Sequence, residues 1–178
     1  AVKLVKARGE FMQAAVPAGE GAMAAILGLE AAQIEAACKE AAQGEVVAPV
    51  NYNAPGQIVI AGNTAAVERA IAACKDLGAR RALPLPVSVP SHCELMRPAA
   101  EKLAEELNQI QLSAPRISLV QNTSAQATTG VEELRQNLLS QLYSPVRWIE
   151  SVEYMASQGV NTYIECGPGQ VLVGLNKR

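Results

Sequence analysis

The one histidine of this 178-residue chain, His92, lies in the stretch LPVSVPSHCELM, where an apolar, proline-containing run gives way to a helix-like segment. An imidazole titrates near neutral pH, and α/β proteins often place catalytic groups at strand ends. His92 is therefore a candidate general base. The competing interpretation is a loop histidine that only hydrogen bonds to the backbone.

The residues beside His92 do not supply a nucleophile. Ser91 and Cys93 are its immediate neighbours, but adjacent side chains of an extended chain point to opposite faces. The chain also lacks G-x-S-x-G, the strained turn that exposes a catalytic serine. The sequence thus predicts a base whose nucleophile lies elsewhere.

Arg8 is a second residue in an unusual place. Residues 1–16 have the pattern of an amphipathic helix, and Arg8 falls within its apolar face, which is formed by Leu4, Val5, Phe11, Met12 and Ala15. A buried guanidinium needs an anionic partner, either a protein carboxylate or a substrate carboxylate held by its two-pronged donor group. The alternative is that the side chain reaches solvent along its own stem.

Four further positions give weaker signals. Gln141 ends a predicted helix just before LYSPVRW and could orient an imidazole through its side chain or its backbone carbonyl, or be an ordinary helix end. Asn53 lies in the turn NYNAPGQ, and Arg81 belongs to an Arg-Arg pair that could meet a phosphate. The GPG at 167–169 superficially resembles a phosphate-binding loop, but the spacing of the dinucleotide and P-loop motifs is absent.

The elements that must position these residues fall into two groups. Between residues 18 and 88 the pattern predicts β-α-β-β-α-β, the ferredoxin-like arrangement, with strands at 22–29, 46–53, 56–62 and 79–87. The helices are predicted at 30–43 and 63–78, the second capped by Asn63 or Thr64.

After His92, helices and strands alternate, which predicts a mostly parallel α/β sheet. The predicted helices are 98–110, 130–143, 145–159 and a short one from 170, and the predicted strands are 116–122 and 161–166. Pro145 would occupy the first turn of its helix, where proline is tolerated.

Composition excludes several classes of function. Hydrophobic residues make up 49% and charged residues 18%, which indicates a packed core. The net charge of −2 without a basic stripe argues against nucleic-acid binding. No membrane-length apolar run and no signal peptide are visible, and the four cysteines form no C-x-x-C pair. We therefore expect a cytoplasmic protein with reduced thiols and no metal site.

Five separated stretches together resemble the malonyl-CoA:acyl carrier protein transacylase family of fatty acid synthesis. They occur in the family's order along the whole chain: RGEFMQAAVPAGEGAMAAILGL, PVNYNAPGQIVIAG, RALPLPVSVPSHCELM, QLYSPVRWIESVEYM and ECGPGQVLVGL. The resemblance implies an α/β-hydrolase-like large domain, here residues 1–17 and 89–178, with an inserted ferredoxin-like subdomain at 18–88.

The resemblance also implies an enzyme, an acyltransferase that needs no cofactor. A serine takes malonyl from malonyl-CoA and passes it to the phosphopantetheine thiol of acyl carrier protein in a ping-pong reaction. His92 matches the family's general base and Gln141 the residue that accepts a hydrogen bond from its ring. Arg8 matches the arginine that holds the malonyl carboxylate, and Asn53 and Arg81 resemble positions that line the CoA cleft.

This sequence departs from the family in its first third. It contains neither the GQGSQ-like motif, which supplies an oxyanion-hole amide, nor the GHSLGE nucleophile elbow. We expect both to lie before Ala1, and the 178 residues alone to lack transferase activity. Two alternatives stay open: the acyltransferase domain of a polyketide synthase, and an inactive fragment or non-catalytic module that binds acyl carrier protein.

Overall fold

The computed structural model describes residues 1–87 and 89–177 of the chain. They form a mixed α/β structure, which confirms the predicted class, and no helix among these residues has the length and apolarity to cross a membrane. The elements in chain order are α1 (Val2–Ala15), β1 (Gly21–Leu27), α2 (Ala31–Ala42), β2 (Val47–Ala54), β3 (Gln57–Asn63), α3 (Thr64–Asp76), β4 (Arg81–Pro84), the 3₁₀ helix η1 (Glu94–Met96), α4 (Arg97–Asn108), β5 (Leu119–Gln121), β6 (Gln126–Thr128), α5 (Val131–Ser140), α6 (Trp148–Ser157) and α7 (Val171–Leu175).

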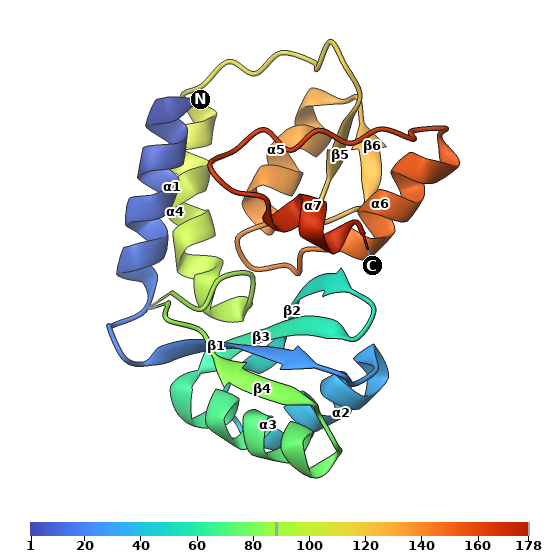
Figure 1. The fold of residues 1–178 in the computed structure, drawn as a ribbon. Coiled ribbons are helices and arrows are strands. Elements are labelled where there is room, and N and C mark those ends of the chain that lie inside the picture. Colours follow the sequence, from blue (N-terminus) through green and yellow to red (C-terminus); the bar gives the residue numbers. More distant parts are fainter. Residues whose placement is uncertain (88, 178) are drawn as a thin grey trace.

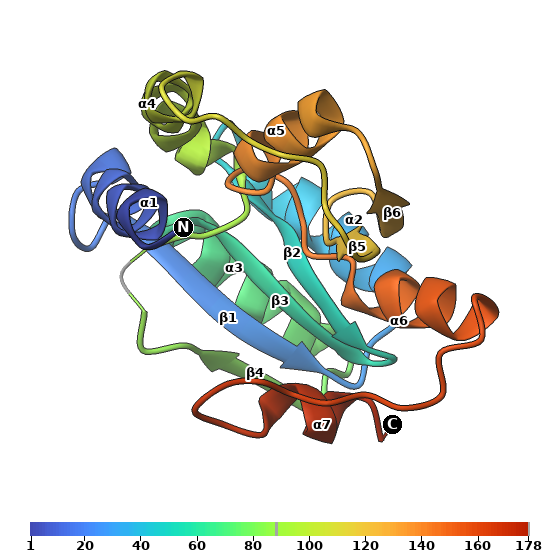
Figure 2. The ribbon, with the colours of Figure 1, turned by 90° about the horizontal axis from the view of Figure 1, so that it is seen from above.

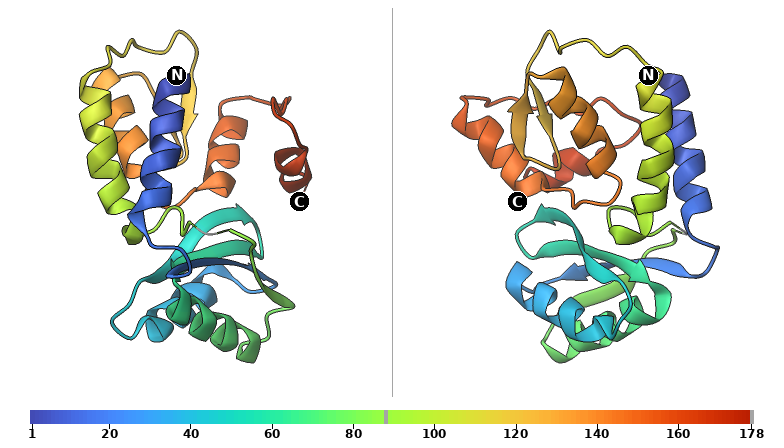
Figure 3. Two further views of the ribbon diagram at one scale, coloured as in Figure 1. Left: turned by 90° about the vertical axis from the view of Figure 1, so that its left-hand side faces the viewer. Right: turned by 180° about the vertical axis from the view of Figure 1, so that it is seen from behind.

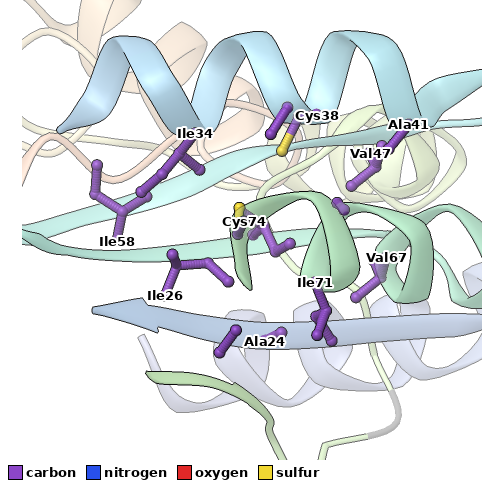
Figure 4. Close-up of a cluster of buried hydrophobic side chains, with 14 of the residues drawn as sticks. Ala24, Ile26, Ile34, Cys38, Ala41, Val47, Ile58, Val67, Ile71 and Cys74 are labelled. Carbon is purple, nitrogen blue, oxygen red and sulfur yellow. The ribbon is translucent and has the colours of Figure 1, made fainter. Parts of the chain in front are cut away.

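The first four strands form one antiparallel sheet. Its strand order is β2-β3-β1-β4, and the sequence order β-α-β-β-α-β is the predicted one. Helices α2 and α3 pack together against one face of this sheet, the lower face in Figure 1. The close-up in Figure 4 shows the apolar side chains that fill the layer between them. Many of these are alanine, which allows the helices to approach the sheet closely.

The opposite face of the sheet is also buried, and it carries the segment that contains His92. Successive residues of a strand point to opposite faces, so Ala24 packs towards α2 and α3 while Met23 belongs to a separate apolar cluster on the other side. Cys93 is part of this second cluster. The neighbour of His92 is thereby anchored to the sheet.

Helices α1 and α4 lie side by side above one end of the sheet, as the two views of Figure 3 show. Their shared core contains Met12 of α1 and Leu103 of α4. Most of the predicted apolar face of α1 points into this core, but Val5 is 67% exposed, so its assignment to the buried face was wrong.

The segment after α4 differs most from the prediction. Instead of a mostly parallel sheet, the described residues contain a two-stranded antiparallel ribbon of β5 and β6. Residues 161–166 form no strand, because no other strand among the described residues lies beside them to share hydrogen bonds. Seen from above, this segment runs along the outside of the molecule between α6 and α7 (Figure 2).

Two local predictions were wrong in part. Helix α6 begins at Trp148, so Pro145 lies before it, and Val146 pairs with Asn51 in an isolated parallel bridge instead of extending the helix. Asn63 occupies the predicted N-cap position of α3, but neither its side chain nor that of Thr64 makes a capping hydrogen bond. The Asn63 amide oxygen accepts from the Val46 N–H at 2.8 Å, and the Thr64 hydroxyl donates to the Gly19 carbonyl at 2.7 Å, because both side chains find partners across the fold.

Candidate active site

His92 lies just before η1, and the residues 90–93 around it are fixed from several directions. Pro90 is buried against Gly21 at the start of β1, so closely that a methyl group on Gly21 would lie 2.5 Å from the proline ring. The backbone of His92 has a φ of 67°, in the left-handed region that residues other than glycine rarely adopt. Such a conformation persists where surrounding contacts determine it, and it often marks a functional position.

Two successive carbonyl groups hold His92 in this conformation. Its ring Nδ1 lies 2.7 Å from the Gln141 carbonyl oxygen, and its backbone N–H donates to the Leu142 carbonyl at 3.0 Å. A carbonyl only accepts hydrogen bonds, so Nδ1 carries the proton and the free lone pair of the neutral ring is on Nε2. Gln141 therefore acts through its backbone, which decides between the two possibilities that the sequence left open.

The surroundings of the ring keep it neutral. Burial lowers the pKa of His92 from its ordinary value of 6.5, the hydrogen bond to Gln141 opposes this, and the positive charge of Arg8 lowers the pKa further. A neutral imidazole with its lone pair on Nε2 is the form that can accept a proton near pH 7.

Arg8 lies on α1, close enough for its charge to act on His92. Its side chain is half-buried, and burial lowers the pKa of its guanidinium. No carboxylate among the described residues forms an ion pair with it. A half-buried cation without a protein anion is suited to bind an anionic ligand.

The neighbours of His92 remain excluded as nucleophiles. Burial raises the pKa of the Cys93 thiol to about 11, and its Sγ donates to the Pro90 carbonyl at 3.2 Å. Such a thiol is inert near neutral pH. Among the hydrogen bonds of the described residues, none joins the Nε2 atom of His92 to a hydroxyl or a thiol, so this half of the site is a base without an adjacent nucleophile.

Asn53 and Arg81 are not brought to His92. Arg81 pairs with Leu27 at the end of β1, whereas the Pro90 contact is at Gly21, six residues earlier, which is roughly 20 Å along the strand. Asn53 lies beside the same far end, in the β2–β3 hairpin. Arg81 borders an open hollow of about 550 Å³, and Asn53 borders a smaller one of about 160 Å³ beside α6.

Two further possibilities, a metal site and a phosphate site at the loop 167–169, gain no support from the described residues. No group of three or more His, Cys, Asp or Glu side chains comes together among them. The loop at 167–169 leads into α7, but the Glu165 carboxylate accepts from the backbone N–H groups of Leu172 and Val173. A carboxylate already occupies the start of this helix, so the weak phosphate-loop signal gains no support.

Comparison with known proteins places this geometry in a family. Residues 1–177 match the family model described as "Acyl transferase domain". The chain belongs to the acyl transferase domain family. It is 61% identical over its full length to the malonyl CoA-acyl carrier protein transacylase of Escherichia coli K12, and 49% identical to that of Bacillus subtilis 168. These matches cover 58% and 56% of the two relatives, so the chain spans little more than half of their length.

Solved structures of acyl transferases agree. An acyl carrier protein S-malonyltransferase from Vibrio cholerae is 59% identical and superposes with a TM-score of 0.98 over 99% of this chain and 58% of its own. A malonyl-transacylase in complex with its type II polyketide synthase acyl-carrier protein is 55% identical, also with a TM-score of 0.98, over 99% of this chain and 57% of its own.

Sequence reasoning missed two residues of this candidate site. Leu142 contributes only its backbone carbonyl, and no side-chain pattern announces a backbone acceptor. Gly21 matters because Pro90 fills the space where a side chain would be, and its neighbours Glu20 and Ala22 gave no hint of that contact. A glycine opening a strand was the one available signal, since glycine in a strand often marks close approach of another backbone segment.

Proposed function

We propose that this chain forms the base-bearing part of a malonyl-CoA:acyl carrier protein transacylase of fatty acid synthesis. The observation that carries the proposal is the pairing of a neutral His92, with its lone pair on Nε2, and the unpaired guanidinium of Arg8. One group serves proton transfer and the other recognises an anion. Malonyl thioesters offer both a carbonyl to attack and a free carboxylate to bind.

The proposed reaction proceeds in two half-reactions. Nε2 of His92 takes the proton of a serine hydroxyl as its oxygen attacks the thioester carbonyl, and the imidazolium returns that proton to the departing CoA sulfur. The malonyl-serine ester then reacts with the phosphopantetheine thiol of acyl carrier protein. His92 takes the thiol proton and returns it to the serine oxygen. The serine is expected in a G-H-S-x-G elbow, a motif that the 178 residues do not contain.

Arg8 would select the acyl group. A bidentate guanidinium–carboxylate contact contributes about 1.5–3 kcal/mol, which corresponds to roughly a 10- to 100-fold preference for malonyl over acetyl. Asn53 and Arg81 lie too far along the sheet to touch the thioester. We assign them to the distant, nucleotide-bearing part of CoA, whose phosphates suit the hollow beside Arg81.

We propose a large domain formed by residues 1–17 and 89–178 with residues 18–88 as an inserted subdomain, a cytoplasmic location, and catalysis without a cofactor. A malonyl transferase needs none for the chemistry above, because the thioester is already activated. The high identity to malonyl CoA-acyl carrier protein transacylases favours this function over a polyketide synthase domain or a non-catalytic binding module.

Intact mass spectrometry of the native protein, before and after brief incubation with malonyl-CoA, tests the proposal. We expect a mass well above the 18.7 kDa of these residues and one malonyl adduct that acyl carrier protein removes. His92→Gln should form the adduct far more slowly, whereas Ser91→Ala, the matched control beside it, should form it normally. A native protein of 18.7 kDa without an adduct would refute the transferase and leave a fragment or a binding module.

A further inference from the structure

The two carbonyls that hold His92 belong to one short segment, residues 141–146, which follows α5. The Gln141 and Leu142 carbonyls accept from the ring and from the backbone N–H of His92. The left-handed backbone of His92 is intrinsically disfavoured, so it depends on these two acceptors staying in place. The orientation of the base is therefore only as fixed as the 141–146 segment itself.

The start of the segment is fixed by apolar packing. The Leu142 side chain is fully buried in the cluster formed by α1 and α4, where it joins Met96 and Leu103. This burial determines where the segment begins. The end of α5 holds it as well, since the Leu142 N–H donates to the Leu139 carbonyl and the Tyr143 N–H to the Ser140 carbonyl, both at 3.1 Å, whereas the residues that follow belong to no helix or strand until Val146.

The end of the segment is fixed by the edge of the four-stranded sheet. The Val146 N–H donates to the Val50 carbonyl at 2.8 Å, and the Tyr52 N–H donates to the Val146 carbonyl at 2.9 Å. Val146 thus extends the sheet by one residue beside β2, in parallel orientation. Val50 is fully buried, so this attachment point is rigid. The segment is held at both ends, and its first two residues carry the His92 acceptors.

We propose that Val146 is a positioning residue for His92: its backbone pairing with β2 holds the 141–146 segment so that the Gln141 and Leu142 carbonyls fix the orientation of the imidazole. The inference deepens the proposed malonyl transfer and rests on it for the expected effect on rate. It assigns the small sheet a part in aligning the base. A loosened segment would leave His92 present and folded, but free to turn and to exchange the proton between its two ring nitrogens.

Val146→Pro in the full-length protein tests this, with Val146→Thr as the matched control. Proline removes the N–H that donates to Val50, whereas threonine keeps it together with the β-branched shape. We expect Val146→Pro to lower kcat for malonyl transfer roughly 10- to 100-fold, as misplacement of a catalytic group by about 1 Å does. The KM for malonyl-CoA should change less than about twofold, because ground-state binding is untouched. Val146→Thr should keep the original kcat.

The decisive measurement is which ring nitrogen of His92 carries the proton, since this measurement does not depend on activity. ¹⁵N NMR of histidine-labelled protein, with the His92 signal assigned by its loss in His92→Gln, should show one tautomer with the proton on Nδ1 in the unsubstituted protein and in Val146→Thr. Val146→Pro should show a mixture of the two tautomers. An unchanged Nδ1–H tautomer in a folded Val146→Pro would overturn the inference. Absence of malonyl transfer in the unsubstituted protein would instead count against the proposed function alone.

If Val146→Pro does not fold, amide hydrogen exchange in the unsubstituted protein tests the inference without any variant. If the segment is held as one unit, the N–H groups of His92 and Val146 open together and should exchange with protection factors that agree within about threefold. A His92 amide that exchanges far faster than that of Val146 would show that the two attachments are independent. That result would also overturn the inference.

Discussion

Replacing Gly21 by alanine should move His92 without touching it. The added methyl carbon would lie 2.5 Å from two carbons of the Pro90 ring and 3.2 Å from a third. Ordinary contacts between carbon atoms are about 3.5–4.0 Å, so Pro90 must move by about 1 Å. A proline ring cannot rotate away, and Pro90 is buried. The displacement therefore passes along the backbone to His92, two residues later.

The expected consequences are measurable in rate and in stability. A shift of about 1 Å in a catalytic group costs on the order of 100-fold in rate, so the rate of malonyl transfer by Gly21→Ala should fall by roughly that factor. Overpacking costs about 1–3 kcal/mol, which for a chain of this size lowers Tm by roughly 2–12 °C. Transfer kinetics with malonyl-CoA and acyl carrier protein, together with thermal unfolding, give both numbers.

Two further variants make the Gly21 experiment decisive. Gly9→Ala is the control, because its added carbon meets no atom within 4 Å and it lies inside α1, where the change should stabilise by about 0.5–1 kcal/mol. Adding Pro90→Ala to Gly21→Ala removes the colliding ring and should recover part of the lost stability, giving a favourable coupling energy. A Gly21→Ala protein with the original rate and Tm would refute the argument that Pro90 transmits the displacement.

Three other predictions follow from the site and the sheet. The pKa of His92 in the folded protein lies below its ordinary value of 6.5, so His92 contributes stability that is present above pH 6.5 and lost as the pH falls through the folded pKa. Equilibrium unfolding at pH values below 6.5 should show this loss in the unsubstituted protein and not in His92→Gln. Arg8→Ala should lower kcat/KM for malonyl-CoA roughly 10- to 100-fold and leave acetyl-CoA little changed, whereas equal losses for both substrates would contradict the carboxylate role. Gly62→Ala should lower the free energy of unfolding by about 3 kcal/mol or more, because its methyl carbon would lie 1.9 Å from the Val46 carbonyl oxygen. A denaturant titration measures this, and a nearly unchanged unfolding midpoint would contradict the close pairing of β2 with β3.

The small sheet was predictable because its information is local. Alternating or continuous apolar runs marked its four strands, and Gly44 and Gly78, both with positive φ, ended the two helices between them. Both faces of the sheet are buried, which explains why strands such as 57–63 read as nearly unbroken apolar runs. Pattern and environment agree there, so the order of elements could be predicted.

The region after His92 was less predictable because strands depend on partners that lie far away in sequence. Thr162, Tyr163 and Ile164 give the stretch 161–166 strand propensity, but propensity forms a strand only where a neighbour shares its hydrogen bonds. The same dependence explains Val146. It follows a proline that favours a helix start, yet the open edge of β2 pairs with it and holds it extended.

The candidate site was predictable to the extent that side-chain chemistry defines it. His92 and Arg8 stood out because a base and a charge occupied positions that their surroundings do not favour. The acceptors that orient the base are backbone carbonyls, which any residue type supplies, so their contribution became visible only in the structure. The resemblance to a family identified Gln141, but no inspection of its side chain could show that the amide group is not what contacts the ring.

The electrostatics of the two residues suit a substrate that carries its own negative charge. Arg8 lowers the pKa of His92, so an imidazolium formed during proton transfer is disfavoured while the guanidinium stands unpaired. On the proposed function, a malonyl carboxylate bound to Arg8 would offset that repulsion and strengthen the base at the moment when a proton must be taken. An acetyl group would not. Discrimination would then act on the chemical step as well as on binding, and malonyl-CoA should exceed acetyl-CoA in kcat and not in KM alone.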